Sequence, residues 1–220
     1  DILVLNKIAP SGLALLPPPR FRTGGDFAAP HAILCRSADL HARGVPASVL
    51  AVARAGAGTN NIPVAELTAR GVPVFNAPGA NANAVKELVL AGMLMAARRL
   101  PQALAFVDAL DVVDPELERV VEDGKKAFAG YELAGQTLGI IGLGKIGCSV
   151  ADAAIALGMQ VIGHDPDITV DAAWRLPSQV RRAASVDEVM RSARFVTLHV
   201  PLLPATKHLV DARRLALMRP

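Results

Sequence analysis

The sequence predicts an α/β fold made of two open parallel sheets. Short apolar runs bounded by turn residues alternate with helical stretches along residues 1–80, a pattern typical of parallel strands joined by crossover helices. A second set of apolar runs begins at Leu138, Gln160 and Phe195, and a glycine-rich turn follows the first of them. With 52% hydrophobic residues among 220, the chain can bury two cores. We expect one domain over 1–98 and a second over 99–220.

Four strands are predicted in the first sheet. They are the apolar runs at residues 2–5, 32–35, 50–54 and 72–76. Between the first two, a proline triplet at 17–19 and the glycine pair at 24–25 favour a loop. A short helix over 64–70 separates the third strand from the fourth.

Three helices are predicted in the middle of the chain. Residues 81–99 are apolar almost all round, so we expect a helix buried on most of its faces. Pro101 suits the first turn of a helix over 101–110. Asp114, followed by a proline and an acid, predicts that another helix begins there and runs to about residue 121.

The second sheet is predicted from three strands, at 138–141, 160–164 and 195–200. Residues 167–180 show no regular pattern, and we expect an irregular segment there. Ser185 and Glu188 have the spacing of a capping box, which predicts a helix to about residue 193. One more helix is predicted over 211–218. These elements form the first half of a doubly wound sheet.

The first of these strands runs into the turn Gly142-x-Gly144-x-x-Gly147, and a helical pattern follows. In such a turn Gly142 makes the tight bend, Gly144 lets the backbone approach a pyrophosphate, and Gly147 lets helix and strand pack closely. The N–H groups at the start of the helix then face the phosphates. The strand–turn–helix context favours a dinucleotide site of the Rossmann type over a glycine turn without a ligand.

Asp165 ends the next strand, 21 residues after Gly144. A carboxylate at this place accepts hydrogen bonds from the ribose hydroxyls of the adenosine and repels a 2′-phosphate. The expected cofactor is therefore NAD rather than NADP. His164, beside it, is interpreted as a residue at the rim of the adenosine pocket.

Two arginines follow neighbouring strands of the first sheet. Arg36 comes directly after the second strand, and Arg54 opens the glycine-rich loop 54–61 after the third. Ligands of open α/β sheets bind beyond the carboxyl ends of the strands, and a glycine-rich loop can direct several N–H groups at an anion. The pair suits a substrate with a carboxylate and a phosphate. The alternative is that both are ordinary surface arginines.

His199 ends the strand at 195–200 and is the one histidine placed for general acid–base chemistry. A buried strand histidine bonded to a backbone carbonyl is the favoured interpretation. No Ser/His/Asp signature and no metal-ligand spacing is present in the sequence.

Composition narrows the remaining possibilities. The net charge is +3, but the arginines are scattered and only 4% of residues are aromatic, which disfavours a nucleic-acid surface. Cys35 and Cys148 are interpreted as reduced thiols. The longest apolar run, 88–97, is about half of a membrane span. The chain opens directly on a strand. We therefore expect a cytoplasmic protein with no signal peptide and no membrane segment.

The order of these motifs resembles the D-isomer-specific 2-hydroxyacid dehydrogenases. The resemblance covers essentially the whole chain and rests on Arg54-Ala-Gly-Ala-Gly-Thr-Asn-Asn61, Asn76-Ala-Pro-Gly-Ala-Asn81 before Glu87, the 142–147 turn, His164-Asp165-Pro166 and His199-Val-Pro-Leu-Leu-Pro-x-Thr206. It implies a flavodoxin-like substrate domain and a Rossmann NAD-binding domain. Four further stretches, at 6–10, 60–63, 85–87 and 171–174, are most similar to the branch that oxidises 3-phospho-D-glycerate, the first step of serine biosynthesis. Asn60 and Lys86 replace the family's usual Asp and Ala, as they do in one part of that branch.

The resemblance also implies roles for single residues. The amides of Lys145 and Ile146 would meet the pyrophosphate, and Gly56 and its neighbours would bind the substrate carboxylate. Arg36 and Arg54 would hold the anionic groups of the substrate. Lys125 matches a basic residue that in some relatives reaches the partner subunit, in a homodimer formed through the NAD-binding domain. Residues expected to line the cofactor are, near the nicotinamide, Ala57 and, near the adenine, Val200, Pro201 and Thr206.

The family's catalytic arginine, glutamate and histidine would all fall after Pro220. The resemblance therefore implies that this chain holds the binding residues of a dehydrogenase and none of the three catalytic side chains. His199 matches a different position of the family. Two alternatives remain open: a dehydrogenase for another 2-hydroxy acid such as glycerate or lactate, and an NAD-binding module without catalysis.

Overall fold

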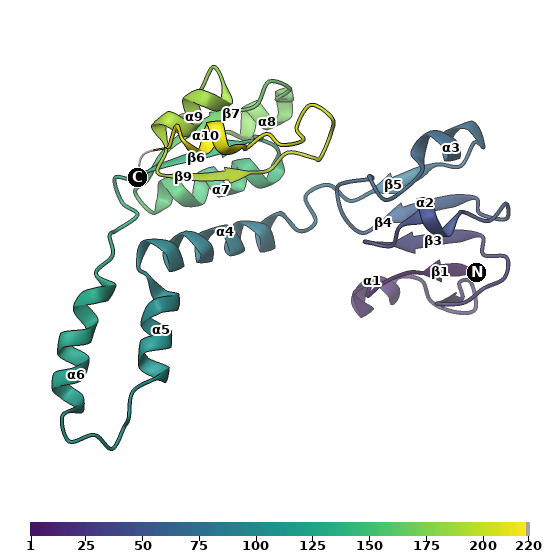
Figure 1. Ribbon diagram of the computed structural model, residues 1–220. Coiled ribbons are helices and arrows are strands. Elements are labelled where there is room, and N and C mark those ends of the chain that lie inside the picture. Colours follow the sequence, from purple (N-terminus) through teal and green to yellow (C-terminus); the bar gives the residue numbers. More distant parts are fainter. Residues whose placement is uncertain (219–220) are drawn as a thin grey trace. The chain divides into compact units, whose positions relative to one another are not determined.

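The computed structural model describes residues 1–218. It divides into two compact units, residues 1–81 and the chain from residue 82 onward, each with its own parallel sheet (Figure 1). The helix α4 (Ala82–Ala97) belongs to the second unit. The boundary predicted at residue 98 lies at the other end of this same helix.

The first unit holds a five-stranded parallel sheet. Its strand order, β2-β1-β3-β4-β5, is one of the common orders of doubly wound sheets. The four predicted strands are present, and the short β2 within the predicted loop joins them at the edge. The strands are β1 (Ile2–Val4), β2 (Thr23–Gly24), β3 (Ala32–Cys35), β4 (Ala51–Arg54) and β5 (Val74–Asn76).

Three short helices accompany this sheet: α1 (Pro10–Leu13), α2 (Leu40–Arg43) and α3 (Val64–Ala69). The core packs α2 and α3 against the central strands through fully buried aliphatic side chains, among them Ile33, Leu40, Val52 and Leu67. The central strands are thereby held in register, and the loops at their carboxyl ends are left at the surface.

A four-stranded parallel sheet organises the second unit, in the order β8-β7-β6-β9. Its strands are β6 (Thr137–Ile141), β7 (Gln160–His164), β8 (Arg181–Arg182) and β9 (Phe195–Leu198). Ile140 and Val161 face α4 and α7 (Lys145–Ala156), whereas Ile141 and Ile162 face α9 (Val186–Ser192). Successive side chains of each strand point to opposite faces of the sheet and thus pack into two cores, one on each face.

Two predictions about local structure are wrong. Residues 167–180 are not wholly irregular, because α8 (Val170–Arg175) forms there with the hydroxyl of Thr169 accepting from the Ala172 amide at 3.2 Å. Asp114 does not begin a helix: its carboxylate accepts from the Glu116 amide at 2.8 Å in a turn. The helix α6 begins three residues later and spans Leu117–Gly124.

The predicted burial of α4 is observed on one face within the second unit. Met93 and Ala97 are buried against the core shared with α7, but Leu88 is 74% exposed, and Leu94 and Met95 are exposed as well. Within the second unit, one face of α4 is covered and the apolar opposite face is open.

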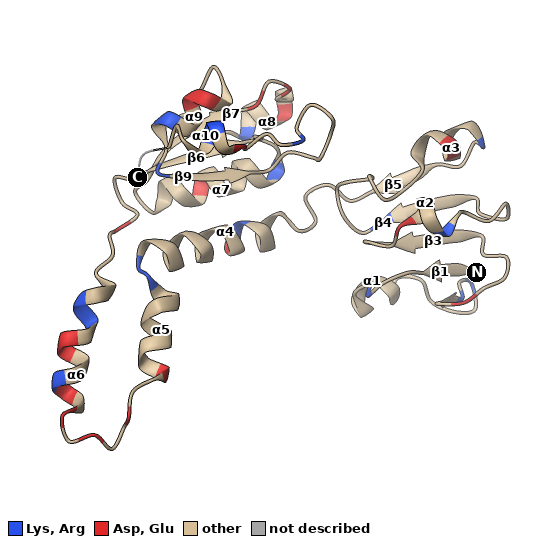
Figure 2. Ribbon diagram, in the orientation of Figure 1, with Lys and Arg blue, Asp and Glu red and all other residues tan. Residues whose placement is uncertain are grey.

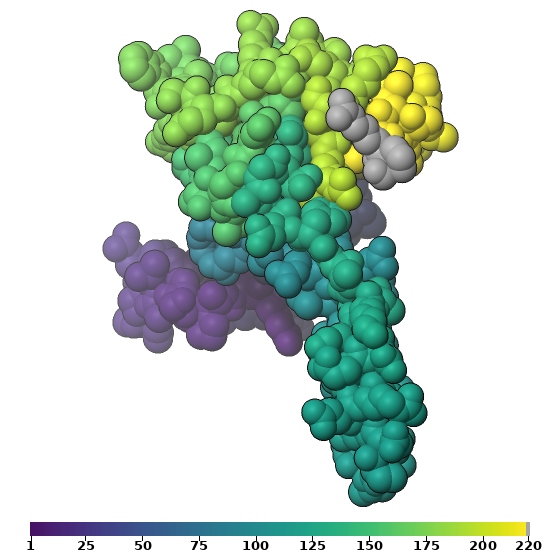
Figure 3. Space-filling model, turned by 90° about the vertical axis from the view of Figure 1, so that its left-hand side faces the viewer, coloured from purple at the N-terminus to yellow at the C-terminus, as the bar shows by residue number. Residues whose placement is uncertain are grey.

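After α4 the chain forms α5 (Leu100–Asp108), α6 and the 3-10 helix η1 (Lys125–Phe128), with Pro101 in the first turn of α5 as predicted. The rings of Phe106 and Phe128 lie 5.3 Å apart and join α5 to η1. The pair α5–α6 projects from the rest of the second unit (Figure 3). Figure 2 shows that α5 is almost uncharged, whereas α6 carries charges of both signs.

The last described helix, α10 (Ala212–Leu215), is capped by Asp211, whose carboxylate accepts from the Arg214 amide. Across residues 1–218, no helix has the length and apolar content needed to cross a bilayer.

Candidate functional site

The glycine turn joins β6 to α7 in the conformation that its sequence predicts. Gly142 has φ +91°, and a β-carbon there would lie 2.7 Å from the carbonyl oxygen of His199. A β-carbon on Gly147 would collide with the carbonyl oxygen of Gly142. These two positions therefore accept only glycine, the first for the bend and the second for close packing of α7 against the turn.

Gly144 differs from the other two glycines. It is exposed, and a β-carbon added to it would meet no atom within 4 Å. It is the N-cap of α7 and has no side chain that could accept from the first N–H groups of the helix. The helix therefore begins at an exposed glycine without a capping side chain, a place that an anion can approach.

Asp165 lies beside this turn. Its Oδ2 accepts a hydrogen bond from the Leu143 amide at 2.8 Å, and its Oδ1 accepts from the Asp167 amide at 3.0 Å. Leu143 is the residue between the first two glycines of the turn. The structure thus brings the predicted ribose ligand next to the predicted pyrophosphate loop, because β6 and β7 are adjacent and parallel.

A pocket of about 490 Å³ opens at Asp165, on the side of the sheet that carries α8. Leu143, Ile168 and Leu176 supply apolar walls, and His164, Asp165 and Arg182 supply polar groups. The His164 ring is held by the carbonyl oxygen of Ala183 at 3.0 Å from Nδ1. Its size and its mixture of apolar walls with few polar groups suit one nucleoside.

The loop after β9 forms another edge of this region. His199 bonds through Nε2 to the hydroxyl of Thr197 at 3.0 Å, a side-chain partner rather than the backbone carbonyl that we expected. Burial lowers the pKa of His199 below its usual value, and no carboxylate compensates for it. Thr206 donates to the carbonyl oxygen of Pro201 at 2.6 Å and accepts from the Leu203 amide, so its hydroxyl shapes the loop that begins at Val200.

Arg54 occupies the corresponding position in the first unit, at the carboxyl end of β4. Its Nε donates to Oδ1 of Asn61 at 3.0 Å. Its Nη1 would lie 2.6 Å from a β-carbon on Gly56 and 3.7 Å from one on Gly58. The guanidinium therefore lies over the glycine-rich loop. The amides of Ala55 and Gly56 donate to the carbonyl oxygens of Cys35 and Arg54, so the guanidinium is the group of this loop that best suits an anion.

Arg36 follows Cys35, which is the register partner of Arg54 in the adjacent strand. The two arginines thus leave neighbouring strand ends, as predicted. Asn6 fixes the backbone at Arg36: its Oδ1 accepts from the amides of three consecutive residues, at 3.1, 2.9 and 2.8 Å, namely Arg36, Ser37 and Ala38.

Two further amide side chains complete this network. Nδ2 of Asn61 donates to the carbonyl oxygen of Ala38 at 2.7 Å, which ties the Arg54 side to the Arg36 side. Asn76 donates to the carbonyl oxygen of Ala57 at 2.7 Å and so fixes the loop predicted to approach the nicotinamide. The sequence pattern did not predict a structural role for Asn6, Asn61 or Asn76. The sequence feature that the three share is an asparagine side chain at or just beyond the end of a predicted strand or loop.

Lys125 lies in η1, at the base of the projecting pair of helices, and its Nζ donates to Glu122 at 2.6 Å. Among the residues that the structure describes, no cluster of three potential metal ligands is present.

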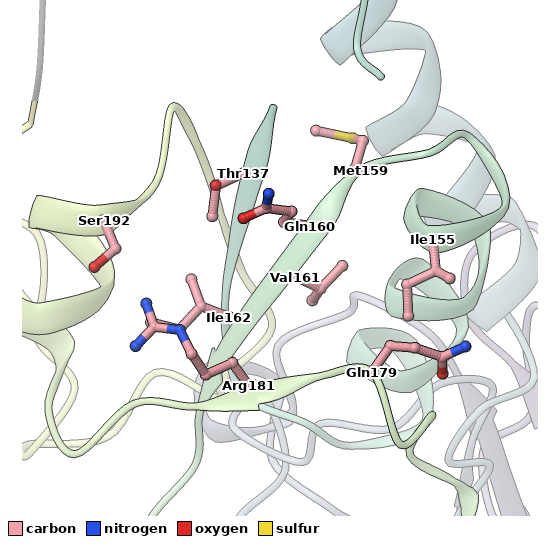
Figure 4. Close-up of a pocket in the computed structure, with 9 residues that line it drawn as sticks. All are labelled: Thr137, Ile155, Met159, Gln160, Val161, Ile162, Gln179, Arg181 and Ser192. Atoms are coloured by element: carbon pink, nitrogen blue, oxygen red, sulfur yellow. The ribbon is translucent and has the colours of Figure 1, made fainter. Parts of the chain in front are cut away.

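A second pocket, of about 510 Å³, opens at the amino ends of β6 and β7, where Thr137 and Gln160 line it (Figure 4). Arg181 reaches into it but pairs with Glu188 at 2.9 Å. None of the predicted site residues lines this pocket.

Comparison with known proteins decides the family. The sequence profile of the D-isomer specific 2-hydroxyacid dehydrogenase NAD binding domain matches residues 90–220. The chain belongs to the D-isomer-specific 2-hydroxyacid dehydrogenase family. Its NAD-binding domain is the part that the profile covers.

The chain is similar to D-3-phosphoglycerate dehydrogenases along its length. It is 42% identical over 168 residues to that of Methanocaldococcus jannaschii, which covers 76% of this chain and 30% of the relative. It is 34% identical over 236 aligned positions to that of Mycobacterium tuberculosis, which covers 100% of this chain and 41% of the relative. The chain thus spans less than half the length of these relatives.

The fold agrees with solved structures. The TT0316 protein of Thermus thermophilus superimposes with a TM-score of 0.78 at 26% identity, covering 99% of this chain and 70% of the other. This similarity supports the two-sheet α/β architecture.

Proposed function

We propose that this chain supplies the NAD-binding and anion-binding parts of an enzyme that oxidises 3-phospho-D-glycerate to 3-phosphohydroxypyruvate. In this proposal residues 1–98 form a flavodoxin-like substrate domain and residues 99–220 a Rossmann NAD-binding domain that the chain holds in part. The observation that supports the dinucleotide site is the hydrogen bond between Asp165 and the Leu143 amide, because it joins the carboxylate that we propose binds the ribose to the turn that we propose binds the phosphates.

The residues fit NAD in three places. The amides at the start of α7 would bind the pyrophosphate, Asp165 the ribose, and the apolar pocket beside it the adenosine. Val200, Pro201 and Thr206 would complete the adenine side. In the first unit Ala57 would approach the nicotinamide.

Bound NAD would accept the hydride from C2 of the substrate. This chain's own residues bind and orient the reactants: the amides around Gly56 and the Arg54 guanidinium would hold the carboxylate, and Arg36 the phosphate. We assign the transfer of the hydroxyl proton to residues beyond Pro220. His199 is not assigned to it, because its ring is committed to Thr197 and burial disfavours its charged form.

We also propose that the complete enzyme is a homodimer joined through the NAD-binding domain. The projecting α5 exposes Leu104 and Val107, and the turn after it exposes Val112 and Val113 at 80% and 81%. An exposed apolar surface on an ordered projection suits a partner subunit.

The test is an assay of the natural full-length protein with NAD⁺ and 3-phospho-D-glycerate, in which the formation of NADH is measured. D-glycerate and D-lactate serve as unphosphorylated comparisons. We expect the phosphorylated acid to be preferred and Arg36→Ala to reduce that preference about tenfold or more, since a charge-assisted contact to phosphate is lost.

An equal loss on phosphorylated and unphosphorylated acids in the Arg36 variant would remove phosphate from the proposal and leave a dehydrogenase for another 2-hydroxy acid. NADH binding without turnover of any of the three acids would indicate an NAD-binding module. The intact mass of the natural protein distinguishes a dehydrogenase from an NAD-binding module before any assay. A mass equal to the 23.0 kDa of this chain leaves no residues for the proton transfer.

A further inference from the structure

Arg182 brings a positive charge to the pocket that contains Asp165. Its side chain is exposed and lines that pocket, and among residues 1–218 it has no hydrogen bond or ion pair to another side chain. We propose that Arg182 makes this pocket a binding site for a phosphate on the ribose 2′-hydroxyl, so that the protein binds NADP as well as NAD. This inference rests on the proposed dinucleotide site and concerns its specificity.

The register of β8 places Arg182 on the side of the cofactor. Arg182 is paired with Gly163 of β7, and Arg181 with Ile162. Ile162 packs in the core with α9, whereas a β-carbon on Gly163 would meet the side chain of Leu143 at 2.9 Å. Successive residues of a strand point to opposite faces, so Arg182 lies on the face of Leu143 and the glycine turn.

Arg181 lies on the other face. In Figure 4 its guanidinium points from β8 past Ile162 in the direction of Ser192 on α9, and it forms an ion pair with Glu188 at 2.9 Å. Of the two neighbouring arginines, one is therefore neutralised on the α9 face and the other is unpaired in the adenosine pocket.

Inside the pocket, one negative and one positive side chain face the same space. The charged groups that line it are Asp165 and Arg182, with His164 held by the Ala183 carbonyl. Both carboxylate oxygens of Asp165 already accept a backbone amide, which partly satisfies its charge. A lone carboxylate would repel a 2′-phosphate, but an arginine beside it offsets that repulsion and offers several donors in a fixed fork.

The side chain of Leu143 packs over Gly163, on the face of the sheet that Arg182 shares. The register partner of Arg182 carries no β-carbon, and the next atoms on that face belong to Leu143, which lines the same pocket. Leu143 therefore fills the space over Gly163, and Arg182 borders the same pocket from β8.

The experiment measures binding of small probes that occupy only the adenosine end. Adenosine 2′,5′-bisphosphate and AMP differ by the 2′-phosphate alone, and NADPH and NADH repeat the comparison with complete cofactors. In the natural full-length protein we expect measurable binding of both members of each pair. Arg182→Ala should weaken the bisphosphate and NADPH about tenfold or more while AMP and NADH change less than about twofold.

Arg181→Ala is the matched control, since it removes the same charge from the adjacent residue on the opposite face. It should leave all four dissociation constants within about twofold. Arg182→Lys retains the positive charge and should retain part of the affinity for NADPH, which separates loss of charge from misfolding of β8.

Failure of this inference is distinguishable from failure of the proposed function. If NADH binds but Arg182→Ala weakens both cofactors equally, or if both arginine variants weaken NADPH equally, Arg182 does not recognise the 2′-phosphate and NAD binding stands. If the wild-type protein binds none of the four probes, both proposals are overturned.

Discussion

The carboxylate of Asp165 accepts a hydrogen bond from the amide of Leu143 at 2.8 Å, which ties the carboxyl end of β7 to the glycine turn between β6 and α7. One side chain thus orders the turn before any ligand arrives, and in our proposal the same side chain binds the ribose. A turn ordered in advance loses less conformational entropy on binding.

We predict that Asp165→Ala weakens NADH binding about tenfold and also lowers the melting temperature. The substitution removes the ribose acceptor and leaves the amides of Leu143 and Asp167 without their shared partner. Asp167→Ala is the control, because only its backbone amide takes part. Fluorescence titration of NADH measures the first effect, and unchanged affinity in Asp165→Ala would contradict our placement of the ribose.

Substitutions at two glycines of the turn should have different effects, one on cofactor binding and the other on the stability of the fold. Gly144→Ala adds a methyl group that meets no atom within 4 Å, so we expect a normal melting temperature together with a large loss of NADH affinity, since the methyl occupies the approach to the pyrophosphate. Gly147→Ala should instead destabilise the fold by about 2 kcal/mol or more, because the methyl collides with the Gly142 carbonyl. Calorimetry and NADH titration on both variants test this contrast; equal behaviour would refute it.

Stability should fall in mild acid because of His199. Burial lowers the pKa of this imidazole in the folded protein, whereas the unfolded chain takes up the proton near about pH 6.5. The unfolded state therefore binds more protons as the pH drops through that value, and the free energy of unfolding decreases. In His199→Gln this decrease should be smaller between about pH 7 and 5. The exposed His41→Gln serves as control, and identical pH profiles for wild type and His199→Gln would rule out this role.

Asn6 should stabilise the loop that carries Arg36. Asn6→Ala removes the acceptor shared by three consecutive amides, and we expect a loss of about 1 kcal/mol because these groups are near solvent. In the full-length enzyme the KM for substrate should rise more than kcat falls. Asn6→Asp keeps the acceptor oxygen and should retain most of both quantities; if Asp is no better than Ala, the loop is held by other contacts.

The apolar surface of the projecting helices gives a prediction about assembly. Leu104→Asp combined with Val113→Asp should shift the natural protein from dimer to monomer in sedimentation experiments, since both side chains are more than half exposed in the single chain. Leu15→Asp, 79% exposed in the first unit, is the matched control. A dimer that survives the double substitution would place the interface elsewhere.

Periodicity and turn chemistry were sufficient to predict most of the regular elements. The apolar strands and the capping of α9 by Ser185 are examples; the hydroxyl of Ser185 accepts from the Glu188 amide at 3.2 Å. The strands β2 and β8 were not predicted, because two residues of Thr-Gly or Arg-Arg have no apolar pattern, and only their neighbours in the sheet make them strands.

The exposure of α4 and the start of α6 were not predictable for a different reason. An all-apolar sequence does not indicate what covers each face, and Asp114 can satisfy a turn as well as a helix. At the candidate sites, the spacing of glycines and acids predicted the turn between β6 and α7 and the place of Asp165 directly after β7; their binding roles stay predictions. The amides that hold the arginine loops act between distant segments, so only the fold brings them together.

The two consecutive arginines of β8 have one more consequence, for evolution. When a strand shifts by one residue along its neighbour, every side chain of the strand moves to the opposite face of the sheet. In β8 such a slip, caused by the gain or loss of one residue between α8 and the strand, would bring Arg181 to the cofactor face in place of Arg182. The loop before β8 can therefore change length by one residue and still leave an arginine on the face that we propose binds the cofactor.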